Sequence, residues 1–218
     1  MSSILALKNV IKDFSEPCVD EIIVVDNNST DRTSQFAKNV GAKVIKEKRQ
    51  GYGFALQKGM KKANGDVIIL TESDCTFNGN DIYKFLSYID DVDMILGTRL
   101  TKELMERGAK MDWFLTWGNL FLAKLIQLKF WGKVRLTDVG CTFRAINKKA
   151  LKKILDKFTV GGSHFSPEMI IRALESDLKT VEIPVHYNTR IGDSKITSTK
   201  FKSFKVGLKM LWLIFFGR

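Results

Sequence analysis

The sequence is poor in cysteine and in proline, with 3 residues of each among 218. Cys18, Cys75 and Cys141 form no CxxC pair, and an odd, widely spaced set makes a poor disulfide framework or zinc site. We therefore expect free thiols in a reducing compartment. Residues 1–14 lack the basic start and the longer apolar core of a signal peptide, so nothing indicates secretion.

Several catalytic motifs are also missing. The chain has no GxSxG element of a serine hydrolase and no GKS or GKT element of a phosphate-loop nucleotidase. His164 and His186 are isolated and have no HExxH context, which argues against a histidine zinc site. Gly51, Gly53 and Gly59 do not follow a strand and open a helix as a dinucleotide fingerprint requires.

What is present is a globular composition. Hydrophobic residues make up 44% and charged residues 27% of the chain, which excludes a disordered or collagenous protein. At this length we expect one domain.

The charge is basic and concentrated near the end of the chain. The net charge is +11, and residues 190–218 hold seven basic residues against one acidic residue. The same segment contains MLWLIFF at 210–216, far shorter than the roughly 20 residues of a membrane span. Basic residues beside an apolar helix end predict a peripheral membrane contact or a docking helix for a partner. Nucleic acid is not expected, because these basic residues accompany an apolar tail rather than base-stacking aromatics.

The first half of the chain alternates between short apolar runs and segments with helical spacing, which predicts βαβ units and an α/β fold with a mostly parallel sheet. The aromatic segment 113–132 predicts a helix that is either buried or lies at a lipid surface. Strands are expected at 21–26, 42–48, 66–71, 93–96 and 179–187, and helices from about 31 to 40, at 51–63 and at 81–89.

Acidic residues follow two of the expected strands. Asp26 and Asp31 come after the first, and Glu72 and Asp74 follow the third. Ligands of doubly wound sheets bind at the carboxyl ends of strands, and two nearby carboxylates suit magnesium or manganese shared with substrate phosphates. The alternative for the first cluster is helix capping.

The motifs, in their order, resemble those of family 2 glycosyltransferases. VVDNNSTDRT is similar to the VVDDxSxDxT element of that family, and the stretch from GYGFALQKG to TESD resembles its GxGxAxxxG and acidic elements. GTR at 97–99, TDVGCTFRAINKKAL at 137–151, FSPEM at 165–169 and RIGDSK at 190–195 continue the match. Together they resemble the polyprenyl-phosphate, dolichol-phosphate mannose synthase-like branch, which implies a GT-A fold.

The resemblance implies a role for each matching residue. Asp74, Arg99 and Glu168 would be catalytic, and Glu72, Asp74 and Thr76 would hold Mg²⁺ or Mn²⁺. The residues implied in donor binding are Asp26, Asn28, Ser29, Asp31, Gly53 and Arg144. The residues implied in binding the acceptor or its phosphate are Arg99, Arg190, Ser194 and Lys195.

The implied reaction is inverting, metal-dependent transfer of a hexose from a nucleotide sugar of the GDP-mannose or UDP-glucose type to a polyprenyl or dolichyl phosphate. A lipid phosphate is already anionic near neutral pH and needs little general-base help. The enzyme would act at the cytoplasmic face of a membrane, alone, as a homodimer or with a membrane-embedded subunit. Residues 1–195 would form the catalytic domain and 196–218 the contact helix.

Two departures from the family pattern stand out. Glu72 replaces the usual first aspartate of the metal motif, and an apolar first strand of the family has no counterpart, because residues 1–16 resemble the helix that should follow it. Either the translation start lies upstream, Ser2–Leu7 substitutes in part, or the chain is a degraded paralogue. The alternative functions are a soluble or glycan hydroxyl acceptor, with Glu168 as base, and a non-catalytic relative.

Overall fold

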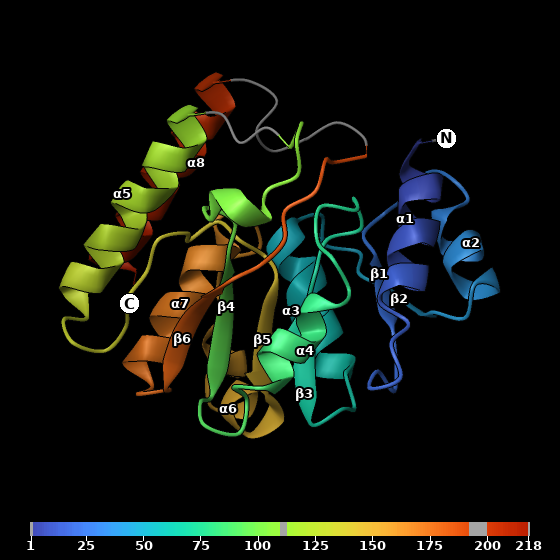
Figure 1. The fold of residues 1–218 in the computed structure, drawn as a ribbon, viewed down its shortest axis with the longest axis horizontal. Coiled ribbons are helices and arrows are strands. Elements are labelled where there is room, and N and C mark those ends of the chain that lie inside the picture. Colours follow the sequence, from blue (N-terminus) through green and yellow to red (C-terminus); the bar gives the residue numbers. More distant parts are fainter. Residues whose placement is uncertain (1, 110–112, 192–199, 218) are drawn as a thin grey trace.

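The computed structural model describes residues 2–109, 113–191 and 200–217 (Figure 1). They form an α/β fold, as the alternating pattern predicts. The strands are β1 Ile23–Asp26, β2 Lys43–Lys46, β3 Val67–Leu70, β4 Met94–Thr98, β5 Arg144–Asn147 and β6 Thr180–Pro184. The α-helices are α1 Ser2–Asp13, α2 Thr33–Asn39, α3 Tyr52–Lys62, α4 Asp81–Leu86, α5 Trp113–Lys129, α6 Lys148–Ile154, α7 Phe165–Glu175 and α8 Lys200–Phe216, and the 3-10 helices are η1 Lys102–Leu104 and η2 Leu155–Lys157.

The strands form two separate sheets. β1 and β2 pair in parallel, and the larger sheet has the order β3, β5, β4, β6. β4 and β6 are parallel, whereas β5 runs antiparallel between β3 and β4. β5 lies in the TDVGCTFRAINKKAL motif and was not among the expected strands.

Alternate residues of the larger sheet face two different cores. Ile68, Met94 and Ile146 belong to the core that contains α6, α7 and the buried side of α8. Ile95 and Ala145 face the opposite core, beneath α4 and the end of α1. This alternation is the one expected for a sheet covered by helices on both faces.

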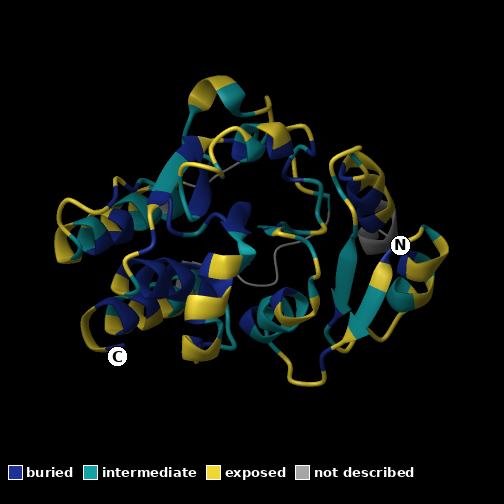
Figure 2. Ribbon diagram, turned by 90° about the horizontal axis from the view of Figure 1, so that it is seen from below, coloured by how far each residue is buried: buried dark blue, intermediate teal, exposed yellow. Residues whose placement is uncertain are grey.

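The N-terminal segment is a helix and not a strand. α1 contributes Val10 to the core of the larger sheet, which Phe14 enters directly after the helix, and it contributes Leu7 and Ile11 to a small core with α2 and β1. The suggestion that Ser2–Leu7 substitutes for a first strand is therefore wrong. Figure 2 shows the β1–β2 unit beside the N-terminus, at one side of the molecule.

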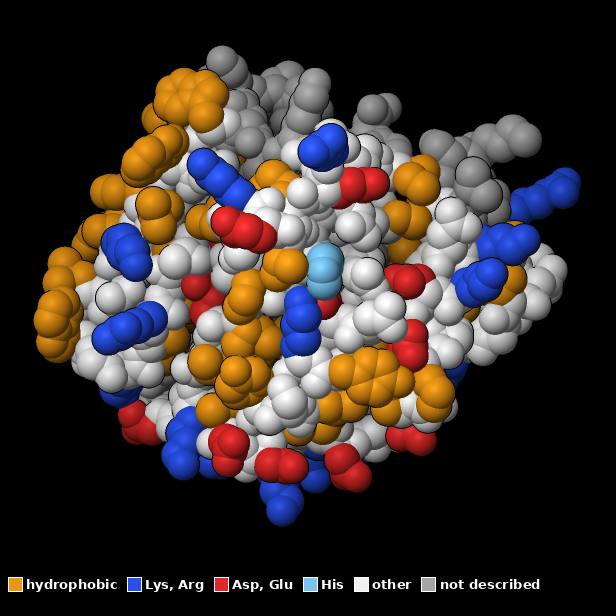
Figure 3. Space-filling model, viewed as in Figure 1, with side chains coloured by type: hydrophobic (Ala, Val, Ile, Leu, Met, Phe, Trp, Pro, Cys, Tyr) orange, Lys and Arg blue, Asp and Glu red, His pale blue; other side chains and the backbone are white. Residues whose placement is uncertain are grey.

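The helices α5 and α8 pack against each other and expose apolar side chains. On α5 the exposed residues recur every three to four positions and include Trp117, Phe121 and Leu128. On α8 they include Trp212 and Phe216, while Met210, Leu213 and Ile214 enter the main core. Figure 3 shows hydrophobic side chains gathered along the edge that α5 forms. None of the described helices is long and apolar enough to cross a membrane.

Candidate active site

A cavity of about 1160 Å³ lies at the carboxyl end of β3 and continues between β1 and β3. Its lining brings together four of the residues singled out from the sequence, namely Glu72, Asp74, Arg99 and Arg190. They come from segments up to 118 residues apart in the chain. The two carboxylates and two guanidinium groups make this the chemically richest part of the cavity.

Arg190 contacts both acidic residues. Its Nη1 lies 2.9 Å from Asp74 Oδ2, and its Nη2 lies 3.1 Å from Glu72 Oε2. The backbone holds this segment in place, because Ile191 N donates to Asp74 O at 2.9 Å and Asn188 N to Thr76 O at 2.8 Å. Burial, followed by the negative charge of Asp74, raises the pKa of Glu72 above its ordinary value.

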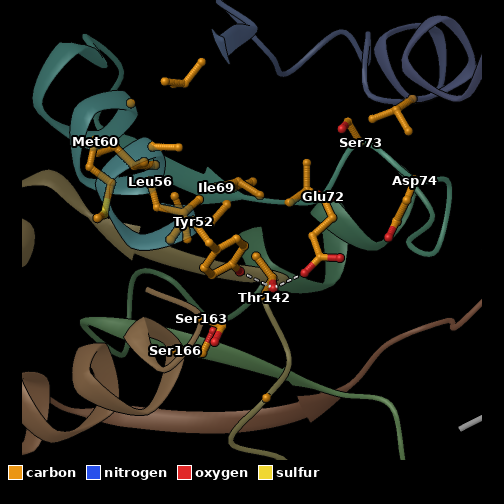
Figure 4. Close-up of a pocket in the computed structure, with 18 of the residues that line it drawn as sticks. Tyr52, Leu56, Met60, Ile69, Glu72, Ser73, Asp74, Thr142, Ser163 and Ser166 are labelled. Carbon is orange, nitrogen blue, oxygen red and sulfur yellow. Dashed lines mark hydrogen bonds between the residues drawn. The ribbon is translucent and has the colours of Figure 1, made fainter. Parts of the chain in front are cut away.

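A chain of hydroxyl groups fixes Glu72 (Figure 4). Thr142 Oγ1 donates to Glu72 Oε1 at 2.6 Å, so the hydroxyl of Tyr52, 2.5 Å from Thr142 Oγ1, must act as the donor to Thr142. Burial, followed by the charge of Glu72, raises the pKa of Tyr52, which keeps the phenol protonated. This contact could not be predicted from the sequence, since Tyr52 and Thr142 lie 90 residues apart.

The acidic pair is suited to a divalent cation. Asp74 Oδ2 is buried and accepts no hydrogen bond from the described residues, although Arg190 lies beside it. Asp74 Oδ1 instead accepts from Thr76 N and Thr76 Oγ1, at 3.1 and 2.6 Å. Thr76 therefore orients Asp74 in this structure, which differs from its implied role as a ligand. Among the described residues, no three or more His, Cys, Asp or Glu side chains are grouped so that they could hold a metal ion together.

Arg99 is held by a buried aspartate that the sequence reasoning missed. Its Nε and Nη2 donate to the two oxygens of Asp138 at 2.7 and 2.8 Å. Burial opposes ionisation of Asp138, but the charge and hydrogen bonds of Arg99 outweigh it and lower the pKa of the carboxyl group. Glu182 accepts from Thr137 N and Asp138 N and so fixes the loop that carries Asp138.

The first acidic cluster lies on the other sheet and does not line the cavity. Asp26 Oδ1 accepts from Ser29 N at 2.9 Å and Asp26 Oδ2 from Ser34 Oγ at 2.5 Å, and these bonds outweigh burial and lower its pKa. Asp31 accepts from the backbone and hydroxyl of Thr33 at the start of α2. Asn28 has a φ of 60° and donates to Lys48 O. Asp31 thus forms a local turn with Thr33 just before α2, whose N-cap is Arg32 and has no side-chain capping bond, so the capping alternative is not borne out for Asp31.

Three further residues implied by the resemblance are enclosed by protein. A Cβ on Gly53 would lie 2.4 Å from Val160 O, so close packing requires this glycine. Arg144 is 2% exposed and donates to the carbonyls of Cys141, Val139 and Ser166. Glu168 is fully buried and accepts from Thr159 and Val160. These three residues do not line the cavity, and Ser194 and Lys195 lie outside the described residues.

Comparison of the sequence with known families gives a clear match. Residues 4–155 match the family described as glycosyl transferase family 2. A low-salt glycan biosynthesis hexosyltransferase of Haloferax volcanii is 32% identical over 178 residues, which cover 81% of this chain and 42% of that protein. A dolichyl-phosphate hexose transferase of the same organism is 31% identical and is matched over 81% of this chain and 73% of its own length.

Comparison with solved structures supports the fold. Glucosyl-3-phosphoglycerate synthase from Mycobacterium tuberculosis, in complex with Mn²⁺, UDP and glucosyl-3-phosphoglycerate, superimposes with a TM-score of 0.72. The match covers 98% of this chain and 76% of that one, at 16% identity. The arrangement of elements is therefore that of a GT-A glycosyltransferase, as the motifs predict.

Proposed function

The chain belongs to glycosyl transferase family 2, and we propose that it transfers a hexose from a nucleotide sugar to a polyprenyl phosphate with inversion at the anomeric carbon. The observation that carries this proposal is the meeting of Glu72 and Asp74 with Arg99 and Arg190 in one cavity. Paired carboxylates suit a divalent cation, and guanidinium groups suit phosphate oxygens.

The donor would lie with its diphosphate beside the acidic pair. Mg²⁺ or Mn²⁺ held by Glu72 and Asp74 would supply positive charge that stabilises the departing nucleoside diphosphate. Arg190, which touches both acids, would bind phosphate oxygens of the donor or the acceptor. Asp26, at the end of β1, would contact the nucleotide of a GDP-mannose or UDP-glucose type donor.

The acceptor would react without a protein base. An anionic phosphate oxygen of the acceptor forms a bond to the anomeric carbon, while the bond from that carbon to the donor diphosphate breaks. Arg99 would orient one of these phosphates, because Asp138 fixes its guanidinium by two hydrogen bonds. Fixed cationic groups that face developing negative charge commonly provide the largest part of such catalysis.

A lipid acceptor is supported by two independent observations. The relative described as a dolichyl-phosphate hexose transferase is matched over most of its length. Exposed aromatic side chains on α5 and α8, such as Trp117 and Trp212, suit contact with a membrane surface or with a membrane-embedded or identical subunit. Cys18, Cys75 and Cys141 are free thiols, which accords with the reducing, cytoplasmic side of such a membrane.

A hydroxyl acceptor is the second candidate, and it needs a general base. Glu168 is fully buried and accepts hydrogen bonds from two backbone amides, an environment that favours a structural role. Glu168→Gln should therefore lower thermal stability while the pH dependence of the turnover of folded enzyme stays unchanged. Loss of the acidic limb of that pH profile, in which a general base becomes protonated, would support a hydroxyl acceptor instead.

Product extraction tests the proposal directly. Labelled GDP-mannose or UDP-glucose is incubated with Mn²⁺ and either a polyprenyl phosphate or a soluble sugar, and the label is counted in the organic phase. We expect label in the lipid fraction with the wild-type chain and with Asp91→Asn, an exposed control, and none with Asp74→Asn. Label only in soluble product would refute the lipid acceptor.

A further inference from the structure

The cavity has a second part that the transfer reaction does not use. Beyond the acidic cluster it is lined by Ile23, Val24 and Val25 of β1 and by Val67, Ile68, Ile69 and Leu70 of β3. The strands β1 and β3 therefore face each other across open space, and among the described residues β1 pairs only with β2 and β3 only with β5. We call this space the interstrand cleft.

Two helices bridge the cleft and hold the sheets together. α1 places Val10 in the core of the larger sheet, whereas Leu7 and Ile11 pack with β1 and α2. α3 lines the cavity with Leu56, Gly59 and Met60, and Met60 belongs to the core on the opposite face of the larger sheet. The cleft is thus covered by helices on both faces and bounded by strands on both edges.

The hydrogen bonds between β1 and β2 show which backbone groups of β1 face the cleft. Ile22 O accepts from Lys43 N and Asp26 O from Glu47 N, both on the β2 side. The N–H and C=O of one strand residue point to the same side, and successive residues alternate. The backbone groups of Ile23 and Val25 therefore point away from β2, into the cleft.

Alternate backbone groups of β3 also face the cleft. Asp66 O accepts from Lys148 N on the β5 side, and the register pairs Ile68 with Ile146 and Leu70 with Arg144. The backbone groups of Val67 and Ile69 point away from β5, toward the cleft. Thr71, two residues after Ile69, also lines the cavity, and its buried hydroxyl has no hydrogen-bond partner among the described residues.

This arrangement specifies the chemistry of an occupant. Two facing rows of strand N–H and C=O groups need backbone partners, which a lipid chain lacks. Helices on both faces require apolar side chains on both sides of the occupant, as in a buried parallel strand. β1 and β3 each have four residues, so a segment of about four to six residues matches their length.

We propose that the interstrand cleft binds an extended apolar peptide strand, which pairs with β1 on one edge and with β3 on the other and joins the two sheets into one. Asp26 lies at the end of β1, and β3 leads into Glu72 and Asp74. A bound strand therefore fixes the distance between the proposed nucleotide contact and the acidic pair. The binding itself does not depend on the proposed transfer reaction.

Amide exchange measured by NMR tests the proposal. Without peptide, the amides of Ile23, Val25, Val67 and Ile69 should exchange faster than those of Val24 and Ile68, which lie in the ladders. Adding the acetylated, amidated peptide KVIVVIK should slow exchange at these four amides at least tenfold and raise the melting temperature. The control peptide KVIPVIK, in which proline interrupts the strand, should do neither.

A variant of the protein supplies the matching control. Gly59 lines the cleft, and a Cβ there would lie 3.2 Å from Val25 Cγ2. Gly59→Leu should remove the peptide effect, whereas Lys61→Ala, an exposed change on the same helix, should keep it. Unchanged exchange at the four amides, equal effects of both peptides, or protection that rises with protein concentration without peptide would overturn the proposal.

Discussion

Arg190 and Asp74 form an ion pair in which Nη1 lies 2.9 Å from Oδ2. The guanidinium thus lies against the carboxylate oxygen that accepts no hydrogen bond from the described residues. A divalent cation bound by Asp74 must compete with this arginine. Arg190→Gln should therefore tighten Mn²⁺ binding in the absence of donor, by about threefold to tenfold for loss of one nearby charge, and weaken donor binding. Calorimetry with Mn²⁺ alone and then with donor measures both effects.

The hydroxyl chain from Tyr52 through Thr142 to Glu72 positions a carboxylate that is one methylene longer than aspartate. Thr142→Val should weaken Mn²⁺ binding about 10- to 100-fold, the usual effect of losing a residue that orients a metal ligand. Tyr52→Phe should have a smaller effect in the same direction. Thr101→Val, outside the cavity lining, is the control, and equal Mn²⁺ affinity in all four proteins would refute the positioning role.

The ion pair between Arg99 and Asp138 should dominate the response of the chain to acid. Asp138→Asn leaves the largely buried Arg99 without its anion and should reduce the free energy of unfolding by about 3–5 kcal/mol near pH 7. Because the folded state lowers the pKa of Asp138, its stabilisation is fully present above the ordinary value of 3.8 and is lost as the pH falls through the lowered pKa.

Urea unfolding at a series of pH values measures this difference. The difference in the free energy of unfolding between wild type and Asp138→Asn should stay constant from pH 7 to about pH 4 and become smaller only below that pH. If this difference already becomes smaller between pH 7 and 5, the ionised Asp138 carboxylate is not the source of the stabilisation.

The exposed faces of α5 and α8 should bind anionic membranes. Trp117→Ser and Trp212→Ser, at residues 64% and 63% exposed, should each weaken binding to vesicles that contain phosphatidylserine by about tenfold. Tyr88→Ser, at an exposed aromatic residue that follows α4, should leave binding unchanged. If the wild-type protein forms dimers and does not bind the vesicles, these faces contact an identical subunit instead of a membrane.

The sequence predicts those parts of the structure that local chemistry determines. Short β-branched runs predict β1 and β3, and the helical spacing of 51–63 predicts α3. β5 was missed because its residues, Arg144–Asn147, contain a charged and a polar side chain and gain their order from pairing with β3 and β4. The acidic pair was found because Glu72 and Asp74 directly follow a strand.

Roles that depend on burial could not be predicted from the sequence. Arg144 and Glu168 match motif positions, yet backbone carbonyls and amides take up their hydrogen bonds inside the protein. Asp138 and Thr142 lie in the matched motif at 137–151, but only folding brings them to Arg99 and Glu72. The signal that could have identified Asp138 is an acidic residue in a motif that also supplies a strand of the sheet.

Calorimetry shows whether donor binding depends on a divalent metal and on Asp74. GDP-mannose and UDP-glucose are titrated by calorimetry, with and without Mn²⁺, into the wild-type chain, Asp74→Asn and the exposed control Asp91→Asn. One donor should bind the wild type and Asp91→Asn only when Mn²⁺ is present, and Asp74→Asn should reduce this affinity at least 100-fold. Equal donor binding by wild type and Asp74→Asn, or donor binding that does not depend on Mn²⁺, would contradict a metal-dependent donor site at the acidic pair.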